Sequence, residues 1–191
     1  GLLTLVIENI TGVSLREFAE KEIFGPLEMN DSFFNDNVNL IVKNRADAYS
    51  LIDKNKQEYV INMTNLSNIG DGGVYTTIND FIKWDNNFYK NILGNRSNNL
   101  LAQMKTNFFG KTAENIKKSN EVYRDEDTYA FAQNFDYKKG YRRWSHSGSW
   151  VGYTAHYSRY EDKNFSVVVF CNNEEIDAQE VSDSIVDFYL D

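Results

Sequence analysis

The chain has 191 residues and a formal net charge of −8, which fits one compact domain, or one and a half, with a sizeable core. A hydrophobic fraction of 41% and a charged fraction of 25% are ordinary for a soluble globular protein, and the 15% of aromatic residues argues against disorder. The acidic excess disfavours a nucleic-acid partner, which requires a basic surface. The sequence contains no apolar run long enough to span a membrane and no basic amphipathic segment.

The first two predicted elements are helices. Residues 2–10 are almost entirely apolar, and we expect a helix there that is buried on most sides and ends at Gly12. Ser14 and Glu17 form a capping box that opens a second helix, which ends at Pro26, the only proline. Because the chain begins with glycine and enters an apolar element at once, we predict that it is cut from a longer protein.

A polar excursion and a glycine-rich turn follow. Residues 29–68 are crowded with Asn and Asp, a composition typical of a surface excursion with short strands. The cluster Gly70-Asp71-Gly72-Gly73 has neither the Lys-Ser/Thr ending of a phosphate loop nor the spacing of a dinucleotide fingerprint. We therefore expect it to form a close backbone turn.

Two further helices are predicted before the strands begin. Thr77 has the position of an N-terminal cap, and Asp80 lies in the first turn, where a helix-start role is favoured over a catalytic one. A short helix is expected at residues 100–104. The charged stretch 111–127 contains few apolar residues and is predicted to be a solvated loop.

The last third of the chain alternates with the period of strands. Residues 129–135 form one such run, and Lys138-Lys139-Gly140 is typical of a hairpin turn. Strand sequence then extends from Tyr141 to Arg159. After a turn, the apolar run 165–171 predicts a buried strand in which Cys171 is a structural thiol.

A C-terminal helix closes the chain, with one apolar stripe made by Val181, Ile185, Phe188 and Tyr189. Helices followed by an antiparallel meander and a closing helix indicate an α+β fold. We assign residues 1–127 to a mostly helical region and residues 128–191 to strands plus the helix, both parts of one domain.

The stretch 144–153 is the focus of the functional interpretation. His146 stands two residues before Gly148, and a glycine in a strand lets a ligand or another backbone approach closely. A twisted edge strand with bulges is the alternative reading. Downstream, we expect His156 on the same strand, with Thr154 and Ser158 on its face.

The order of these motifs resembles the serine beta-lactamase and penicillin-binding-protein-like hydrolases, most closely the class C beta-lactamase and D-alanyl-D-alanine carboxypeptidase branch. Each matching stretch is weak by itself, and their joint order carries the resemblance. They are the helix ending in Ile10-Thr11-Gly12, Ile23-Phe24-Gly25-Pro26-Leu27-Glu28-Met29 (where the family usually has Pro-Leu-Gly-Met), Gly70-Asp71-Gly72-Gly73-Val74-Tyr75-Thr76-Thr77 with Asp80 and Trp84, and His146-Ser147-Gly148-Ser149 with Gly152-Tyr153.

The resemblance implies covalent catalysis, in which the serine of a Ser-x-x-Lys motif attacks a carbonyl and a Tyr-x-Asn element handles protons. His146 matches the family's third motif, Lys-Thr-Gly or His-x-Gly, and the backbone N–H of Ser149 matches an oxyanion donor. Ser147, Gly148, Trp150 and Tyr75 are assigned to substrate binding. For Trp150 and its neighbour Trp144, the sequence does not separate a substrate wall from a core position.

The departure from the family is the missing nucleophile. No acceptable Ser-x-x-Lys occurs, since Ser14 is followed by Leu-Arg-Glu and Ser119 by Asn-Glu-Val. We therefore interpret the chain as a C-terminal fragment of a serine hydrolase, inactive alone. The alternative is a non-catalytic remnant or binding module. Histidine in place of lysine favours an esterase or peptidase over an antibiotic-resistance enzyme, because carboxylate recognition becomes weaker or pH-dependent.

Other catalytic sets are poorly supported. A serine adjacent to His146 cannot align with it, because neighbours on a strand point to opposite faces. No ligand spacing favours zinc, and no cofactor is implied. The carboxylates at 125–127 and 174–175 are read as solvated turns.

The partners expected from these observations are a small-molecule or peptide substrate, and either a second copy or the absent N-terminal segment, which would pair with an exposed sheet edge. An exported or cell-envelope location is implied by the family alone.

Overall fold

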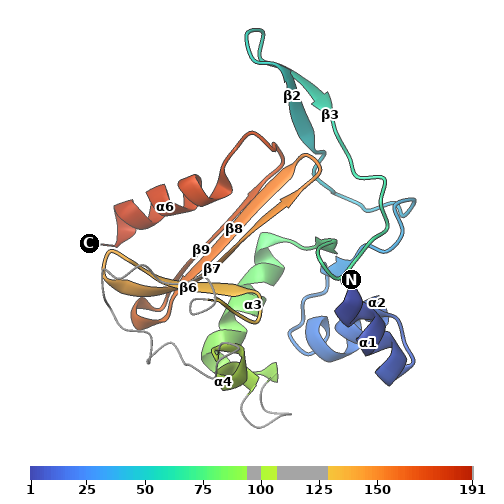
Figure 1. Cartoon of the computed structure of the whole chain (residues 1–191), viewed down its shortest axis with the longest axis vertical. Helices are drawn as coiled ribbons and strands as arrows, with labels where there is room; N and C mark the ends of the chain where they lie inside the picture. The colour runs from blue at the N-terminus through green and yellow to red at the C-terminus, as the bar shows by residue number, and fades with distance from the viewer. Residues whose placement is uncertain (94–99, 107–128, 191) are drawn as a thin grey trace. The chain divides into compact units, whose positions relative to one another are not determined.

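The computed structural model describes residues 1–93, 100–106 and 129–190, and it combines helices with antiparallel sheet as the α+β prediction requires (Figure 1). The chain divides into two compact units. One comprises Gly1–Ala46 and Thr64–Asn98, and the other comprises Asp47–Met63 and Asn99–Asp191. Within the described ranges, no helix has both the length and the apolar character needed to cross a membrane.

The first unit is mainly helical. Its elements are α1 (Leu2–Thr11), α2 (Leu15–Ala19), the π-helical turn η1 (Glu20–Phe24), β1 (Phe33–Phe34), β4 (Val74–Tyr75) and α3 (Ile78–Lys90). Strands β1 and β4 pair antiparallel. The buried core of this unit consists of Ala19, Phe24, Leu27 and Met29. The predicted polar excursion contains β1 and one hairpin, which pairs β2 (Tyr49–Asp53) with β3 (Glu58–Ile61). This hairpin belongs to the other unit.

The predicted helix boundaries of the first unit are confirmed. Ser14 Oγ accepts the Glu17 N–H, while the Glu17 carboxylate accepts the Ser14 N–H at 3.0 Å, so both free donors at the start of α2 are satisfied. The helix ends in a π turn just before Pro26. Thr77 caps α3 through the Asp80 N–H, and the Gly70 N–H donates to the Gly72 carbonyl in the predicted tight turn.

The prediction that the first helix is buried on most sides is wrong. Helix α1 has no buried residue, and the exposed fractions of Leu2, Leu3 and Ile10 are 82%, 75% and 76%. The reason is that polar residues hold this helix to its unit. The Thr4 hydroxyl donates to the Ile69 carbonyl, and Glu8 accepts the Leu15 N–H, which turns the leucines outward.

Asp80 joins α3 to the segment before β1. Its side chain is 2% exposed and accepts hydrogen bonds from the Asp31 N–H, the Ser32 hydroxyl and the Lys83 ammonium. Burial by itself would raise the pKa of Asp80, but the hydrogen bonds from Lys83, Ser32 and Asp31 outweigh it and lower the pKa below its ordinary value. The role is structural, in keeping with the helix-start reading.

Replacing Asp80 by asparagine is expected to lower the free energy of unfolding by about 1–3 kcal/mol at neutral pH, because charge-assisted hydrogen bonds are lost. A lowered native pKa stabilises the fold above the unfolded value of about 3.9, and this stability is lost as the pH falls through the native pKa. Urea unfolding of the parent and of Asp80→Asn, measured from neutral pH down through the native pKa of Asp80, checks the effect. An equally large loss in the exposed control Asp71→Asn would contradict it.

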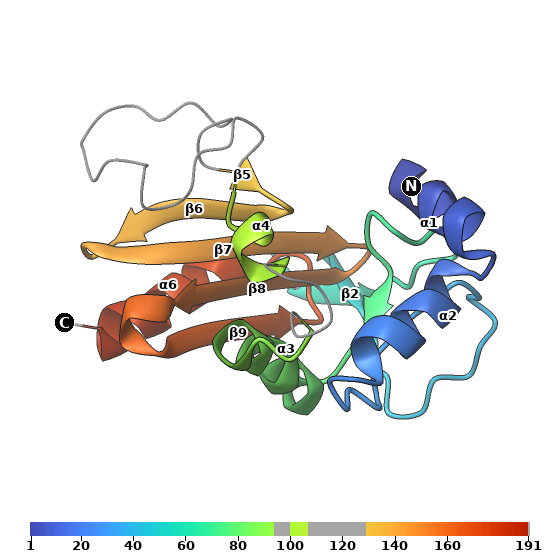
Figure 2. The same cartoon turned by 90° about the horizontal axis from the view of Figure 1, so that it is seen from below.

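The second unit is built on a five-stranded antiparallel sheet of order β5-β6-β7-β8-β9 (Figure 2). Its elements are β5 (Tyr129–Ala130), β6 (Gln133–Lys138), β7 (Tyr141–Trp150), β8 (Tyr153–Tyr160), the 3-10 turn η4 (Glu161–Lys163), β9 (Phe165–Cys171), α4 (Leu100–Met104) and α6 (Ala178–Tyr189). Helix α6 packs on one face of the sheet, where Val186 and Leu190 contact Tyr160 and Val167. The predicted short helix at 100–104 and both turns, at 138–140 and 161–164, are confirmed.

Several details of the second unit differ from the prediction. The run 129–135 is not one strand, because Phe131 and Ala132 both adopt positive φ and form a turn between β5 and β6. The sequence from Tyr141 to Arg159 forms two strands joined at Val151-Gly152. The described sheet therefore has five strands rather than the three expected. The loop predicted at 111–127 lies outside the described residues.

The closing helix and the last strand are less buried than predicted. Helix α6 buries Ala178, Ser182 and Val186, while Phe188 and Tyr189 are 78% and 67% exposed, so the predicted stripe is wrong in part. The buried face is displaced because Ser182 meets Ser158 of β8 at its centre. In β9 only Val167 is buried, and Cys171 is partly exposed rather than a buried thiol.

Candidate functional site

The segment His146–Trp150 of β7 has an open edge. Strand β6 pairs with β7 only from Tyr141 to Ser145, whereas β8 pairs with it from Trp144 through Trp150. Among the described strands, none pairs with His146–Trp150 on the side away from β8. The backbone of this segment is therefore available to a ligand that lies along the strand.

The alternation of the ladder directs the Ser149 backbone toward that open edge. Trp150 and Tyr153 close a two-residue turn, so this pair exchanges hydrogen bonds and the next pair, Ser149 with Thr154, does not. The N–H and C=O of Ser149 consequently point away from β8. This is the orientation that a backbone oxyanion donor requires.

The side chains of this segment alternate between the two faces of the sheet. Ser147 meets Gln179 of α6, so it lies on the α6 face, and the neighbouring His146 and Gly148 lie on the opposite face. The His146 imidazole is exposed, with its Nε2 3.4 Å from the Tyr129 hydroxyl. The expectation that His146 forms no triad with an adjacent serine is consistent with this placement.

The second histidine occupies an unexpected position. His156 is on β8, not on the strand of His146, and it lies directly opposite Ser147, with 2.9 Å between its Nδ1 and the Ser147 Oγ. The Ser147 hydroxyl donates to Gln179 Oε1, so the Ser147 oxygen accepts the His156 Nδ1–H. His156 is 2% exposed, and its Nε2 has no hydrogen-bond partner among the described residues.

Burial, and next to it the charge of Arg143, lowers the pKa of His156 below its ordinary value. Arg143 is held by two carboxylates, with a bidentate contact to Asp136 and a 2.9 Å hydrogen bond to Asp183 of α6. The neutral His156 thus fixes the rotamer of Ser147 and holds the α6 face of β7 in place. The pairing would have been visible in the sequence had the hairpin at Val151-Gly152 been recognised.

The remaining predicted site residues have different environments. Trp144 is 3% exposed and packs with Phe135 at a ring distance of 5.0 Å, which assigns it to the core. Trp150, at the end of β7, is only partly buried. Tyr75 belongs to the first unit, where its ring packs against Phe33 at 5.6 Å and its hydroxyl is buried without a hydrogen-bond partner among the described residues.

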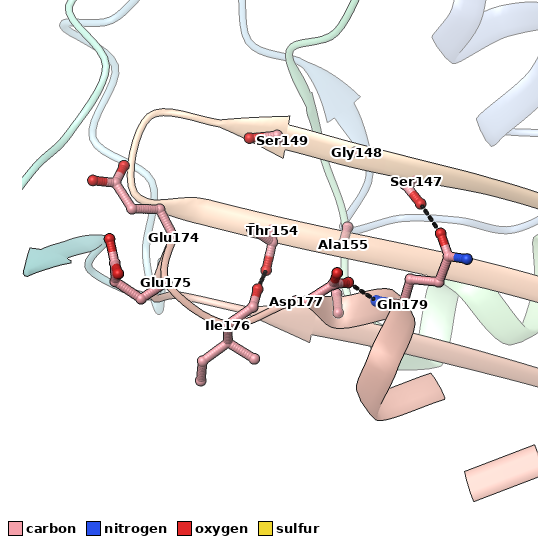
Figure 3. Close-up of a pocket in the computed structure, with 11 residues that line it drawn as sticks. Ser147, Gly148, Ser149, Thr154, Ala155, Glu174, Glu175, Ile176, Asp177 and Gln179 are labelled. Atoms are coloured by element: carbon pink, nitrogen blue, oxygen red, sulfur yellow. Dashed lines mark hydrogen bonds between the residues drawn. The ribbon is translucent and has the colours of Figure 1, made fainter. Parts of the chain in front are cut away.

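A cavity of about 460 Å³ adjoins β7 on the α6 face (Figure 3). One wall is the end of the β7–β8 hairpin and the other is the segment that leads into α6. The lining residues are Ser147, Gly148, Ser149, Thr154, Ala155, Glu174, Glu175, Ile176, Asp177, Ala178 and Gln179. The wall formed by residues 174–179 was not predicted, since the sequence showed only a solvated acidic turn. Among the described residues, no group of His, Cys, Asp and Glu is arranged to hold a metal ion.

Comparison with known proteins gives consistent results. The family model described as Beta-lactamase matches residues 1–189. Penicillin-binding protein 4* of Bacillus subtilis (strain 168) is 26% identical, with 91% of this chain and 38% of that protein aligned. The chain therefore spans about four-tenths of the length of this curated relative.

Two solved structures show the same fold. The octameric penicillin-binding protein homologue from Pyrococcus abyssi is 24% identical with a TM-score of 0.77, covering 99% of this chain and 40% of that one. D-amino acid amidase from Ochrobactrum anthropi SV3, complexed with L-phenylalanine amide, is 18% identical with a TM-score of 0.66, covering 97% of this chain and 54% of that one.

Proposed function

Because the chain belongs to the beta-lactamase family, we propose that it supplies the strand bordering the active site of a serine hydrolase that cleaves an amide or ester. The observation that carries this proposal is the free edge of β7 at His146–Trp150, with the Ser149 N–H directed outward. A carbonyl lying along this edge can place its oxygen against that N–H. Negative charge that develops on the oxygen is then stabilised, an effect worth on the order of 3 kcal/mol for one donor.

The reaction proposed is acyl transfer in two steps. A serine hydroxyl attacks the carbonyl carbon, its proton passes to the leaving amine or alcohol, and the acyl group remains on the serine until water releases it. Residues 1–191 contain no Ser-x-x-Lys to supply this serine. The role proposed for this chain is to orient the substrate carbonyl with Ser149 and Gly148. His146 would contact the substrate from the sheet face opposite the α6 face. The substrate class favoured is a peptide or small amide or ester, rather than a beta-lactam.

Labelling with a fluorophosphonate probe, read by intact mass, tests the proposal. The 191-residue chain is expected to remain unlabelled, while a longer protein in which a Ser-x-x-Lys segment precedes Gly1 is expected to gain one adduct. An adduct on the 191-residue chain would place the nucleophile within it and overturn the assignment. No adduct on either protein would favour the alternative of a non-catalytic binding module.

Replacing His146 by alanine in that longer protein is expected to lower kcat/KM for acyl transfer roughly 10- to 100-fold, the effect of losing one hydrogen bond to a charged group. The matched control is Tyr129→Phe, which removes only the hydroxyl 3.4 Å from the imidazole and should leave turnover nearly unchanged. Steady-state kinetics with a chromogenic ester measures both. Unchanged turnover in His146→Ala would remove His146 from the site.

We also propose an association through β9, the last strand of the described sheet, with a second copy or with a segment preceding Gly1. Sedimentation at increasing concentration tests the first arrangement, since a stable monomer would count against it.

A further inference from the structure

We propose that His156 is a positioning residue for the backbone donor of Ser149, and that the open segment of β7 keeps its geometry only while this imidazole is neutral. The inference rests on the proposed function, because it concerns the strand segment to which that function is assigned. His156 lies on the α6 face of the sheet, opposite Ser147, whereas His146 lies on the other face. It therefore acts on the site through Ser147 rather than through the substrate.

The backbone of Ser147 does not bond to β8 within the described ladder. Every second residue of β7 exchanges backbone hydrogen bonds with β8, and Ser147 stands two residues before Ser149, so both residues belong to the pairs that do not. The N–H and C=O of Ser147 consequently point to the open edge. Opposite residues in such a pair approach more closely than those of a hydrogen-bonded pair, so their side chains can meet. A side-chain contact is thus the means by which β8 can hold Ser147.

The contact with His156 supplies this hold. Ser147 Oγ accepts the Nδ1–H of His156 at 2.9 Å and donates its own proton to Gln179 Oε1 at 3.3 Å (Figure 3). One hydroxyl is thereby linked to β8 on one side and to α6 on the other. Because Ser149 follows two residues later on the same strand, a displacement of Ser147 also displaces the Ser149 N–H. A misplacement of about 1 Å in a reacting geometry is enough to slow a reaction about 100-fold.

The environment of His156 suits a neutral imidazole. The residue is 2% exposed, and its Nε2 has no hydrogen-bond partner among the described residues. A bare lone pair at this position costs less than a second N–H, which would be a charged, buried donor without an acceptor. Strand β9 contributes only the apolar Val169 opposite the ring. The charged groups that face the imidazole are Arg143 of β7, Asp136 of β6, and Asp177 and Asp183 of α6.

The three carboxylates do not offset the cost of protonation. Asp136 and Asp183 bind Arg143, and Asp177 caps the start of α6. Burial therefore dominates and, with the charge of Arg143, lowers the pKa of His156. Neutral His156 contributes its full stability above the unfolded pKa of about 6.5, and this contribution decreases as the pH falls from that value toward the native pKa.

Protonation of His156 is expected to release Ser147. The imidazolium gains stability by turning its Nε2–H toward water or toward a carboxylate of α6, and either movement pulls the ring away from Ser147 and Ser147 away from Gln179. The Ser149 N–H is then no longer fixed toward the position of the substrate carbonyl. The proposed site is therefore weakened by acid through a residue that lies outside it.

NMR titration of the ¹³C,¹⁵N-labelled chain from about pH 8 to about pH 4.5 tests this inference without need of a nucleophile. The imidazole of His156 is expected to titrate with a midpoint below about 6.5, and the amide resonances of Ser147 and Ser149 are expected to shift with the same midpoint. A His156 ring that stays neutral to the end of this range would overturn the inference. So would a ring that titrates while both amide resonances stay unchanged.

Two matched variants locate the effect. His156→Asn carries an amide nitrogen on Cγ, as the imidazole carries Nδ1, so it keeps a donor for Ser147 and cannot titrate. It is expected to abolish the common midpoint in the amide resonances of Ser147 and Ser149. His146→Gln removes the other histidine of the chain and should preserve that midpoint. A midpoint that persists in His156→Asn, or that is lost in His146→Gln, would overturn the inference. If His156→Asn does not fold, the titrations of the parent and of His146→Gln decide it.

In the longer protein that carries a Ser-x-x-Lys segment, the pH dependence of kcat/KM supplies the functional readout. The ratio of kcat/KM for His156→Asn to that of the parent is expected to rise about tenfold for each pH unit below the midpoint of His156, because a single group titrates. A ratio that is constant with pH would show that His156 is merely structural and would overturn the inference.

The two proposals fail in distinguishable ways. A longer protein that resists the fluorophosphonate probe would overturn the hydrolase, while the titration of the chain would still decide whether His156 controls Ser149. A longer protein that is labelled by the probe, with a ratio that is constant with pH, would overturn the role of His156 alone.

Discussion

Replacing Gly152 by alanine is expected to lower the free energy of unfolding of the sheet-containing unit by roughly 2–4 kcal/mol, the sum of backbone strain and overpacking. Gly152 has φ +71°, a conformation that side chains disfavour. A Cβ at this position would lie 2.5 Å from the Ala48 Cβ and 2.6 Å from the Asn62 carbonyl oxygen. Both neighbours are fixed, since the Asn62 N–H donates to the Ala48 carbonyl.

Gly148→Ala is the matched control within the same hairpin. A Cβ there meets only the Ala155 Cβ, at an ordinary contact distance of 3.7 Å, so stability should change little. Urea unfolding followed by tryptophan fluorescence measures both variants. If Gly152→Ala unfolds at the midpoint of the parent, the close approach of the turn to Ala48 is not a real constraint. If Gly148→Ala lowers the unfolding midpoint more than Gly152→Ala does, the space beside Gly148 is not open.

The effect of Gly152 extends to the candidate site, because its N–H donates to Glu174 and its turn sets the register of β7 against β8. The Ser149 N–H points to the open edge only in this register, since a shift by one residue would turn it toward β8. Impaired ligand binding in Gly152→Ala therefore accompanies impaired folding. Gly148→Ala, by contrast, would test access to the strand without a loss of stability.

Local signals in the sequence predicted the element boundaries well. The capping box at Ser14, the cap at Thr77 and the glycine in the Lys139-Gly140 turn act through bonds or backbone angles within a few residues, so the pattern by itself indicates them. The turn at Phe131-Ala132 has no such signal. Both residues adopt positive φ without Gly or Asn, and a continuous alternation of apolar residues concealed the reversal.

Side-chain burial was harder to predict because it depends on distant partners. The apolar sequence of α1 predicted burial, yet its polar Thr4 and Glu8 make the contacts with the rest of the unit. In α6, Ser182 is buried and Phe188 is exposed, which reverses what hydrophobicity suggests. The candidate site shows the same limit, since Ser147 and His156 are nine residues apart and meet only through pairing of β7 with β8.

Arg143 organises the contact between α6 and the sheet, and its replacement by methionine is expected to have the second large effect. The side chain is 9% exposed and bridges Asp136 of β6 to Asp183 of α6. Hydrogen bonds to Asp136 raise the pKa of Arg143 above its ordinary value despite burial, so it is charged at every relevant pH. Methionine retains the apolar stem but removes the cation from Asp136 and leaves Asp183 with the Lys138 ammonium, 3.4 Å away.

The expected cost of Arg143→Met is about 2–4 kcal/mol in the free energy of unfolding, near the lower end for breaking a buried pair, because Asp136 and Asp183 are partly exposed and can hydrate. The control Arg142→Met removes the exposed contact with Asp162 and should cost at most about 1 kcal/mol. Chemical unfolding compares the two variants, and equal midpoints would contradict a structural role for Arg143.

A second readout separates this charge effect from a loss of packing. The positive charge of Arg143 contributes, after burial, to the lowered pKa of His156. Its removal should therefore raise the pKa of His156 toward the ordinary value of about 6.5, which NMR titration of the imidazole measures. An unchanged His156 pKa in a folded Arg143→Met variant would show that burial alone keeps this histidine neutral.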